Sequence, residues 1–258
     1  MTFLAPSGFR KRLIGLEPLL GTFLKTPSSH NAEILGSLGF DFLVIDAEHA
    51  PFDRSTIEVA LLGARAAGCA AIVRVAEPSP AQLLAALDDG AAGVMVPHVS
   101  SPEQAQEVVR ACRYLGGRRG FSNSPRAGGY GAVGLRRHTE EQDAAVAIIA
   151  MIEDPKALDC LDAILRTEAL DGIFIGRADL AVAMNETAPN APAVQAATET
   201  ILAAAARAGK SACIMTSSLA EAQYLRALGA TSFVVSSDQG LMRQAALQAL
   251  ETFTALRA

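Results

Sequence analysis

The chain has 258 residues, 50% of them hydrophobic, and a net charge of −5 at pH 7. It has no basic tract, which argues against nucleic acid as a partner, and its four cysteines lack the CxxC spacing of a zinc knuckle or a disulfide framework. The longest uncharged apolar run, 144–152, is too short to cross a bilayer. The composition therefore predicts a cytoplasmic protein without nucleic-acid or membrane partners.

Short apolar runs, each followed by a polar turn, predict eight β-strands. In chain order they cover 21–25, 42–46, 71–75, 93–97, 146–153, 172–176, 212–216 and 232–236. Amphipathic, alanine-rich stretches between them predict helices at 55–67, 80–87, 102–113, 155–165, 194–208, 219–228 and 240–253. This alternation predicts parallel strands, and the continuous apolar runs predict strands that are buried on both faces. Eight such units in about 250 residues predict an α/β fold, a single-domain (β/α)8 TIM barrel over 1–258.

The longest segment without a periodic pattern is 116–138, which is rich in glycine, serine and arginine. A loop of this length in a compact domain usually has a function or lies at an interface. We therefore expect this segment to contribute to a site or to a subunit contact.

Charged side chains gather where the second predicted strand ends. Asp46, Glu48 and His49 directly follow the apolar run 42–45. Carboxylates and a histidine are costly to hold at the edge of a core, and the carboxyl ends of barrel strands are where active sites form. This segment therefore predicts acid–base chemistry, with His49 as a general base beside Asp46.

Three further charged residues occur at the ends of other strands. Glu153 and Asp179 follow the adjacent fifth and sixth strands, and Arg74 lies in the third. Two carboxylates can share Mg²⁺ or Mn²⁺ with waters and a substrate, and an arginine can stabilise an oxyanion. A metal, a base and an oxyanion holder together predict an enzyme that forms an enolate.

Each of these residues also has a structural interpretation. Asp179 could cap a helix that starts at Leu180, and Glu153 could cap one that opens at Asp154. Arg74 could form an ion pair inside the barrel, and His49 could be a core histidine. Glu48 has the strongest claim to a merely structural role in the strand-two group.

Four segments together resemble the HpcH/HpaI aldolase family of metal-dependent class II pyruvate aldolases. They are 46–51 (Asp-Ala-Glu-His-Ala-Pro), 72–75, 152–153 and 171–180. The resemblance implies reversible retro-aldol cleavage of a 4-hydroxy-2-oxo acid to pyruvate, or a close 2-oxo acid, and an aldehyde. It also implies a homo-oligomer, a hexamer built as a trimer of dimers, with a C-terminal helix that is exchanged between subunits.

The same resemblance implies residue roles. Glu153 and Asp179 would bind Mg²⁺, Mn²⁺ or Co²⁺, and the backbone amides of Ala178 and Asp179 would hold the pyruvate carboxylate. Arg74 would bind the C2 oxygen, and Arg126 would contact the aldehyde half. His49, oriented by Asp46, would act as acid and base on the C4 hydroxyl.

The chain departs from the family pattern at two positions. Met151 stands where members usually have glutamine, and Arg177 stands where they usually have proline. Neither change removes a predicted metal ligand. The guanidinium of Arg177 could bind a second substrate carboxylate or could point to solvent.

Three other functions compete with this hypothesis. A Schiff-base aldolase would need a desolvated lysine, for which Lys25 at the end of the first strand is the only candidate. A transferase of the same family would condense an acyl thioester with oxaloacetate, as a citrate synthase does. A non-catalytic binding protein is disfavoured, because Glu153, Asp179, Arg74 and His49 are all present.

Overall fold

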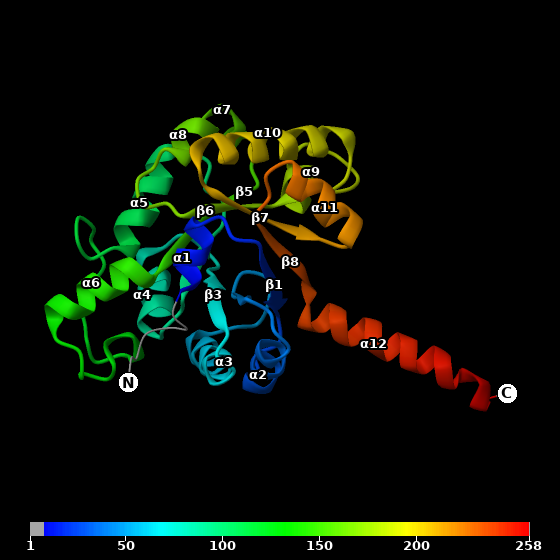
Figure 1. The fold of residues 1–258 in the computed structure, drawn as a ribbon, viewed down its shortest axis with the longest axis horizontal. Helices are drawn as coiled ribbons and strands as arrows, with labels where there is room; N and C mark the ends of the chain where they lie inside the picture. Colours follow the sequence, from blue (N-terminus) through cyan, green and yellow to red (C-terminus); the bar gives the residue numbers. More distant parts are fainter. Residues whose placement is uncertain (1–7, 258) are drawn as a thin grey trace.

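The computed structural model describes residues 8–257 and contains a closed barrel of eight parallel strands (Figure 1). Each strand pairs with the next, and the last pairs with the first. The predicted TIM barrel is thus confirmed. The strands are β1 (Leu19–Leu24), β2 (Phe42–Asp46), β3 (Ala70–Arg74), β4 (Gly93–Val96), β5 (Ala147–Ile152), β6 (Gly172–Ile175), β7 (Ser211–Thr216) and β8 (Ser232–Ser237).

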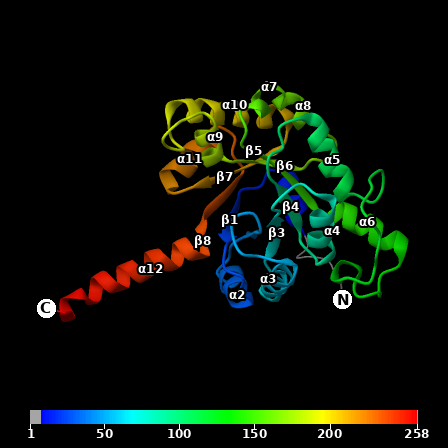
Figure 2. The same cartoon turned by 180° about the vertical axis from the view of Figure 1, so that it is seen from behind.

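Helices surround the barrel (Figure 2). They are α1 (Phe9–Ile14), α2 (Ser29–Ser37), α3 (Arg54–Ala66), α4 (Pro80–Asp88), α5 (Pro102–Cys112), α6 (Leu135–Ala145), α7 (Lys156–Asp159), α8 (Leu161–Leu165), α9 (Arg177–Ala183), α10 (Pro192–Ala208), α11 (Leu219–Ala227) and α12 (Asp238–Phe253), with short 3-10 turns at Arg126–Gly128 and Thr254–Arg257. Every predicted helix has a counterpart, although 155–165 is divided into α7 and α8. The predicted helices did not include α1, α2, α6 or α9, although a helix from Leu180 was considered as a structural role for Asp179. α6 begins inside the segment that showed no periodic pattern.

Local signals explain where many helices begin. Ser79 and Ser101 are N-caps whose side chains accept backbone N–H groups three residues later. Pro80 and Pro102 occupy the first helical positions, where no N–H donor is needed. These Ser-Pro pairs set the starts of α4 and α5.

The interior of the barrel is filled by side chains that alternate along the strands. Phe42 is fully buried there, and its ring occupies the space that a side chain at Gly21 would need. A Cβ at Gly21 would lie 2.5 Å from that ring, so β1 requires glycine at this position. Burial of a phenylalanine of this kind contributes about 1.5–3 kcal/mol to folding.

The same alternation directs the charged residues into the barrel mouth. Val44, Ile72 and Met151 belong to the interior cluster. Asp46, Arg74 and Glu153 each lie two residues further along the same chain segments, so they point toward the barrel axis as well. The mouth at the carboxyl ends of the strands therefore carries these three charges.

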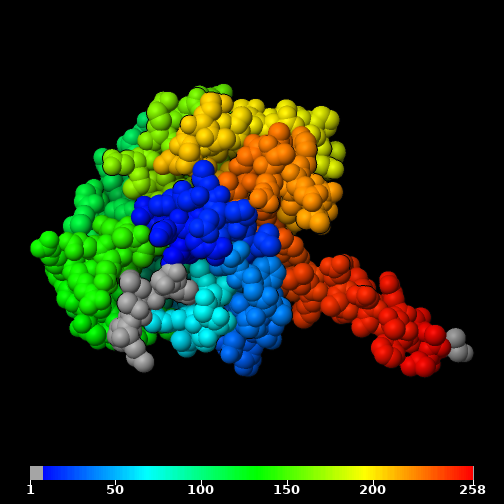
Figure 3. Space-filling view, viewed as in Figure 1, coloured from blue at the N-terminus to red at the C-terminus, as the bar shows by residue number. Residues whose placement is uncertain are grey.

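Beyond its first turn, where Asp238 is buried and accepts the backbone N–H groups of Lys25 and Thr26, the last helix extends away from the barrel. In Figures 1 and 3, α12 projects away from the body of the molecule. Its side chains are exposed along most of its length, including Met242, Leu247, Leu250 and Phe253. Among the described residues, no helix is both long enough and apolar enough to span a bilayer.

Candidate active site

A buried ion pair lies at the mouth, where β2 and β3 end. Arg74 donates from Nε to Asp46 Oδ1 at 2.9 Å and from Nη2 to Asp46 Oδ2 at 2.7 Å. The two residues are register partners on β2 and β3, which brings them together although 28 positions separate them. Nζ of Lys25 lies 2.9 Å from the same Oδ2. The carboxylate of Asp46 is therefore fully occupied by two cations.

The cations keep Asp46 ionised. Burial by itself would raise the pKa of Asp46, but the hydrogen bonds and charge of Arg74, together with Lys25, lower it to about 2. Because this value lies below the ordinary 3.8, the ion pair stabilises the fold above about pH 4. That stabilisation is lost as the pH falls from about 4 toward 2.

We expect Asp46→Asn to lower the free energy of unfolding at pH 7 by about 3–5 kcal/mol, because it removes the bidentate counterion of a buried guanidinium and leaves only Glu48 beside one of its nitrogens. Urea unfolding between pH 2 and 7 measures this, and the variant should lose the acid-dependent decline that Asp46 causes. Asp41→Asn is the control, since Asp41 pairs with Arg12 near the surface and should cost about 1 kcal/mol at most. Equal losses in the two variants would contradict the assignment.

Glu48 lies at the centre of the mouth, not at its margin. Its Oε2 is 3.3 Å from Nη1 of Arg74 and 3.7 Å from Nε2 of His49. Its Oε1 is 3.6 Å from Nε2 of His98. Glu48 thus connects Arg74 with both histidines, so its contacts reach well beyond the structural role that the sequence favoured.

The expected pairing of Asp46 with the His49 ring is wrong. Asp46 accepts only the backbone N–H of His49, at 3.1 Å, and the imidazole lies beside Glu48 instead. The physical reason is that the register of β2 and β3 sets the Asp46 side chain against Arg74, which binds both of its oxygens. The His49 side chain is 55% exposed at the mouth, so a substrate can reach it.

His98, which the sequence left ambiguous between a core histidine and a functional one, also lies at the mouth beside Glu153 and Glu48. Its backbone N–H donates to Oε1 of Glu153 at 2.8 Å, and its Nδ1 lies 3.3 Å from the same oxygen. The residue follows β4 with φ 57°, a left-handed conformation that costs of order 1–3 kcal/mol and is concentrated at functional sites. Applying the strand-end rule to the fourth strand would have identified it.

Glu153 and Asp179 approach each other across Gly176. A Cβ at Gly176 would lie 2.7 Å from Oε2 of Glu153 and 3.5 Å from Oδ2 of Asp179. Burial raises the pKa of Glu153, the N–H of His98 opposes this, and the negative charges of Asp179 and Glu48 raise it further. Two carboxylates therefore converge on a space that only glycine leaves open.

The start of α9 differs from the sequence expectation. The helix begins at Arg177 with Gly176 as its N-cap, so Asp179 lies in the first turn and does not cap the helix. Met151, the other departure from the family pattern, is buried in the barrel interior. Arg177 points away from the mouth and pairs with Glu221 on α11.

Arg126 does not reach the mouth of its own barrel. Its guanidinium contacts the side chain and backbone carbonyl of Glu58 and the carbonyl of Asp89, which lies between α4 and β4. Nε donates to the hydroxyl of Tyr130 at 3.2 Å. Within one chain Arg126 therefore belongs to the outer helical layer, because the long loop folds against α3 and α4. Arg126 therefore does not reach the mouth of its own chain, where it was expected to contact the aldehyde.

Comparisons with known proteins agree with this arrangement. The model of the HpcH/HpaI aldolase/citrate lyase family matches residues 19–245. The chain is 34% identical over 250 residues to a 5-keto-4-deoxy-D-glucarate aldolase of Shigella dysenteriae serotype 1 (strain Sd197), covering 96% of this chain and 97% of that one.

Solved structures show the same similarity. An HpcH/HpaI aldolase/citrate lyase family protein from Burkholderia cenocepacia J2315 superposes with a TM-score of 0.90 at 32% identity, covering 97% of this chain and 99% of that one. The citrate synthase SbnG superposes with a TM-score of 0.87 at 27% identity, covering 96% and 97%.

A closed barrel of eight parallel strands with charged side chains gathered at the carboxyl ends of its strands is the architecture of a TIM-barrel enzyme. The chain belongs to the HpcH/HpaI aldolase/citrate lyase family. It is a carbon–carbon lyase of the aldolase kind.

Proposed function

We propose that this protein is a divalent-metal-dependent aldolase that reversibly cleaves a 4-hydroxy-2-oxo acid to pyruvate, or a close 2-oxo acid, and an aldehyde. The observation that carries the proposal is the joint position of buried Arg74 and the pair Glu153 and Asp179 at one barrel mouth. The oxygen of an enolate needs a cationic partner. Arg74 supplies one positive charge, and Glu153 and Asp179 could hold a metal cation near it.

The residues at the mouth fit a divalent cation. Glu153 and Asp179 offer only oxygen donors and converge over Gly176, and burial together with the charge of Asp179 raises the pKa of Glu153. In the described part of the chain, no three acidic, histidine or cysteine side chains gather into a complete cage. Two carboxylates completed by waters and substrate are the pattern of Mg²⁺ or Mn²⁺, and Co²⁺ is a further candidate. Such a cation would act as a Lewis acid toward the 2-oxo acid.

The remaining roles fall to the chain's own groups. Arg74 would hold the C2 oxygen, with Asp46 fixing the plane of its guanidinium. The backbone amides of Ala178 and Asp179 would receive the carboxylate of the 2-oxo acid. His49 would take the proton from the C4 hydroxyl as the C3–C4 bond breaks, with Glu48 beside its ring.

A panel of aldehydes with pyruvate and Mn²⁺, analysed by product mass, tests this proposal. Since the relatives above are named for a keto-deoxy sugar acid, aldehydes derived from sugar acids belong in the panel. We expect condensation products that disappear in EDTA and return with Mn²⁺, Co²⁺ or Mg²⁺. Full activity in the chelator would refute the metal requirement.

We expect His49→Ala to reduce aldol cleavage about 10²–10⁴-fold, because the C4 hydroxyl loses its base. Exchange of the pyruvate methyl protons involves no C4 hydroxyl, so it should fall much less. Proton NMR in D₂O measures exchange, and coupled pyruvate release measures cleavage. His30→Ala, at an exposed position on α2, is the control. Equal losses of both reactions in His49→Ala would contradict the division of roles.

A transferase is the second candidate, favoured by the similarity to the citrate synthase SbnG. Release of free thiol from acetyl-CoA in the presence of oxaloacetate would support it. A Schiff-base mechanism is disfavoured, because Lys25 lies 2.9 Å from the ionised carboxylate of Asp46. In that ion pair Nζ is bound to a carboxylate, whereas a Schiff base needs an amine that is free to attack a carbonyl carbon. Borohydride trapping of pyruvate on Lys25 would overturn this assignment.

The proposal includes a homo-oligomer in which α12 packs on another copy of the chain. Leu20 on the outer face of β1 is 51% exposed, and α12 presents apolar side chains that no residue of its own barrel covers. A hexamer built from dimers, in the cytoplasm, is the assembly that we propose, and sedimentation measurements test its mass. We also propose that residues 1–258 form one domain, of which 1–7 and 258 lie outside the described residues.

A further inference from the structure

The segment that carries Asp179 has little support of its own. α9 spans seven residues, and its N-cap, Gly176, has no side chain that could accept an N–H group. Gly176 cannot be replaced by a capping residue, since a Cβ there would lie 2.6 Å from Cβ of Glu153. Glycine is conformationally permissive and short helices are marginal by themselves. Leu180 and Ala181 anchor α9 in the core, and a side-chain contact of its first residue adds to this support.

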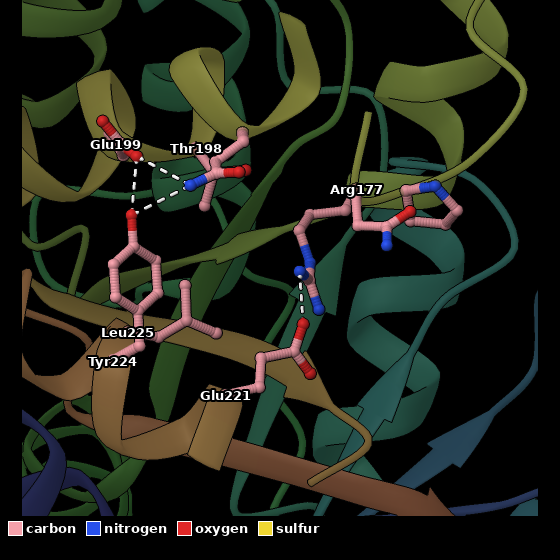
Figure 4. A pocket seen from close by; sticks show the side chains of 9 residues that line it. Arg177, Thr198, Glu199, Glu221, Tyr224 and Leu225 are labelled. Atoms are coloured by element: carbon pink, nitrogen blue, oxygen red, sulfur yellow. Dashed lines mark hydrogen bonds and ion pairs between the residues drawn. The ribbon is translucent and has the colours of Figure 1, made fainter. Parts of the chain in front are cut away.

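Arg177 makes such a contact across two loops. Its Nη1 donates to Oε1 of Glu221 at 2.8 Å (Figure 4). Its Nη2 donates to the carbonyl of Met215 at 2.7 Å. Met215 is in β7 and Glu221 is in the first turn of α11. The side chains of Arg177 and Glu221 are only 16% and 26% exposed. The start of α9 is thereby joined to the neighbouring strand and helix.

Glu221 is held in place from the opposite side. Its Oε2 accepts from the hydroxyl of Thr216 at 2.9 Å and from the backbone N–H of Ser217 at 3.0 Å. Burial would raise the pKa of Glu221, but Arg177 and these donors lower it to about 2. Oε2 of Glu221 thus binds the β7–α11 turn, and Oε1 binds Arg177.

We propose that Arg177 and Glu221 form a strap that positions Asp179 at the barrel mouth. The proposal rests on the function proposed above, since it concerns the orientation of a predicted metal ligand. Arg177 acts here as a positioning residue and touches no substrate.

The strap gives a physical reason for the departure at position 177. Proline at the first position of a helix fixes φ near −65° and so orders the helix start by itself. Arginine has no such backbone constraint. In this chain a side-chain contact to α11 replaces the restraint that the ring would supply.

The alternative role for Arg177, binding a second substrate carboxylate, is less well supported. Two of its three nitrogens are already engaged by Glu221 and Met215. The guanidinium borders a cavity of about 320 Å³ on the outer side of the barrel, together with Gln195 and Tyr224 of α10 and α11. This cavity lies among the surrounding helices and does not include the mouth residues.

Hydrogen exchange of the metal-free protein tests the strap directly. We expect Arg177→Met and Glu221→Gln each to speed amide exchange over 177–183 about fivefold, the effect of a partly exposed ion pair. The effects of the two substitutions should not add in the double variant, because each single variant already removes the contact between Arg177 and Glu221. Arg207→Met, which breaks an exposed pair with Asp162, is the control and should leave this segment unchanged. Unchanged exchange in both strap variants would overturn the proposal.

Calorimetry with Mn²⁺ alone provides the second measurement. Arg177→Met and Glu221→Gln should weaken Mn²⁺ binding about fivefold, whereas Arg177→Pro should keep the affinity because the ring restrains the same backbone. Equal weakening of Mn²⁺ binding in Arg177→Pro and Arg177→Met would contradict the proposal that the contact restrains the backbone at the start of α9. Unchanged affinity in both Arg177→Met and Glu221→Gln would contradict it as well. If the wild-type chain binds no Mn²⁺, the proposed function fails, and hydrogen exchange still decides whether the strap exists.

Discussion

Arg74→Ala should reduce kcat/KM for aldol cleavage by about 10²–10³, the usual cost of removing an oxyanion donor. Exchange of the pyruvate methyl protons should fall by a similar factor, because both reactions pass through the same enolate. The structure supports this expectation, since Arg74 is 6% exposed, reaches the mouth, and is aligned by two hydrogen bonds to Asp46. Steady-state cleavage and proton NMR measure the two reactions.

A matched variant separates charge from geometry at this position. Arg74→Lys keeps the positive charge but cannot make two parallel bonds to Asp46. We expect it to fold, as judged by its unfolding curve, and to recover only a small part of the lost activity. Proton exchange that survives in Arg74→Ala would show that the enolate is stabilised elsewhere.

Glu153→Gln should abolish activity at ordinary metal concentrations and weaken Mn²⁺ binding more than about 100-fold. Loss of an outer-shell partner of a metal ligand already costs about 10–100-fold in affinity, and Glu153 is proposed to bind the metal directly. The substitution preserves shape, and it removes a carboxylate whose pKa is raised by burial and by Asp179 and Glu48. Calorimetry with Mn²⁺ measures binding without depending on turnover.

Glu48→Gln is the control for the charge of the mouth. Glu48 lies in the same cluster but contacts Arg74 and His98, and it is not a proposed ligand. Its substitution should leave Mn²⁺ affinity within about tenfold of wild type, as expected for a group outside the ligand shell. Equal weakening in both variants would mean that the general negative charge of the mouth, and not Glu153 itself, attracts the cation.

The structure differs from the sequence-based predictions mainly in which side chains contact each other across the fold. The pattern placed Asp46 near His49, but the register of β2 and β3 sets Asp46 against Arg74. A bidentate ion pair inside the barrel outweighs a neighbour three residues away along the chain. Arg126 was expected near a substrate, yet the loop that carries it folds against Glu58 and Asp89. No local sequence pattern predicts the pairing of Asp46 with Arg74 or the contact of Arg126 with Glu58.

The sequence by itself determined the strand–helix alternation, the number of strands and the strand ends that carry charge. These features depend on apolar runs, Ser-Pro caps and terminal glycines, which act within a few residues. Only the tertiary structure decided that Glu48 and His98 join the mouth, that Arg177 ties α9 to α11, and that α12 leaves the barrel. The physical reason is that side-chain partners and helix packing depend on which surfaces meet after the barrel closes.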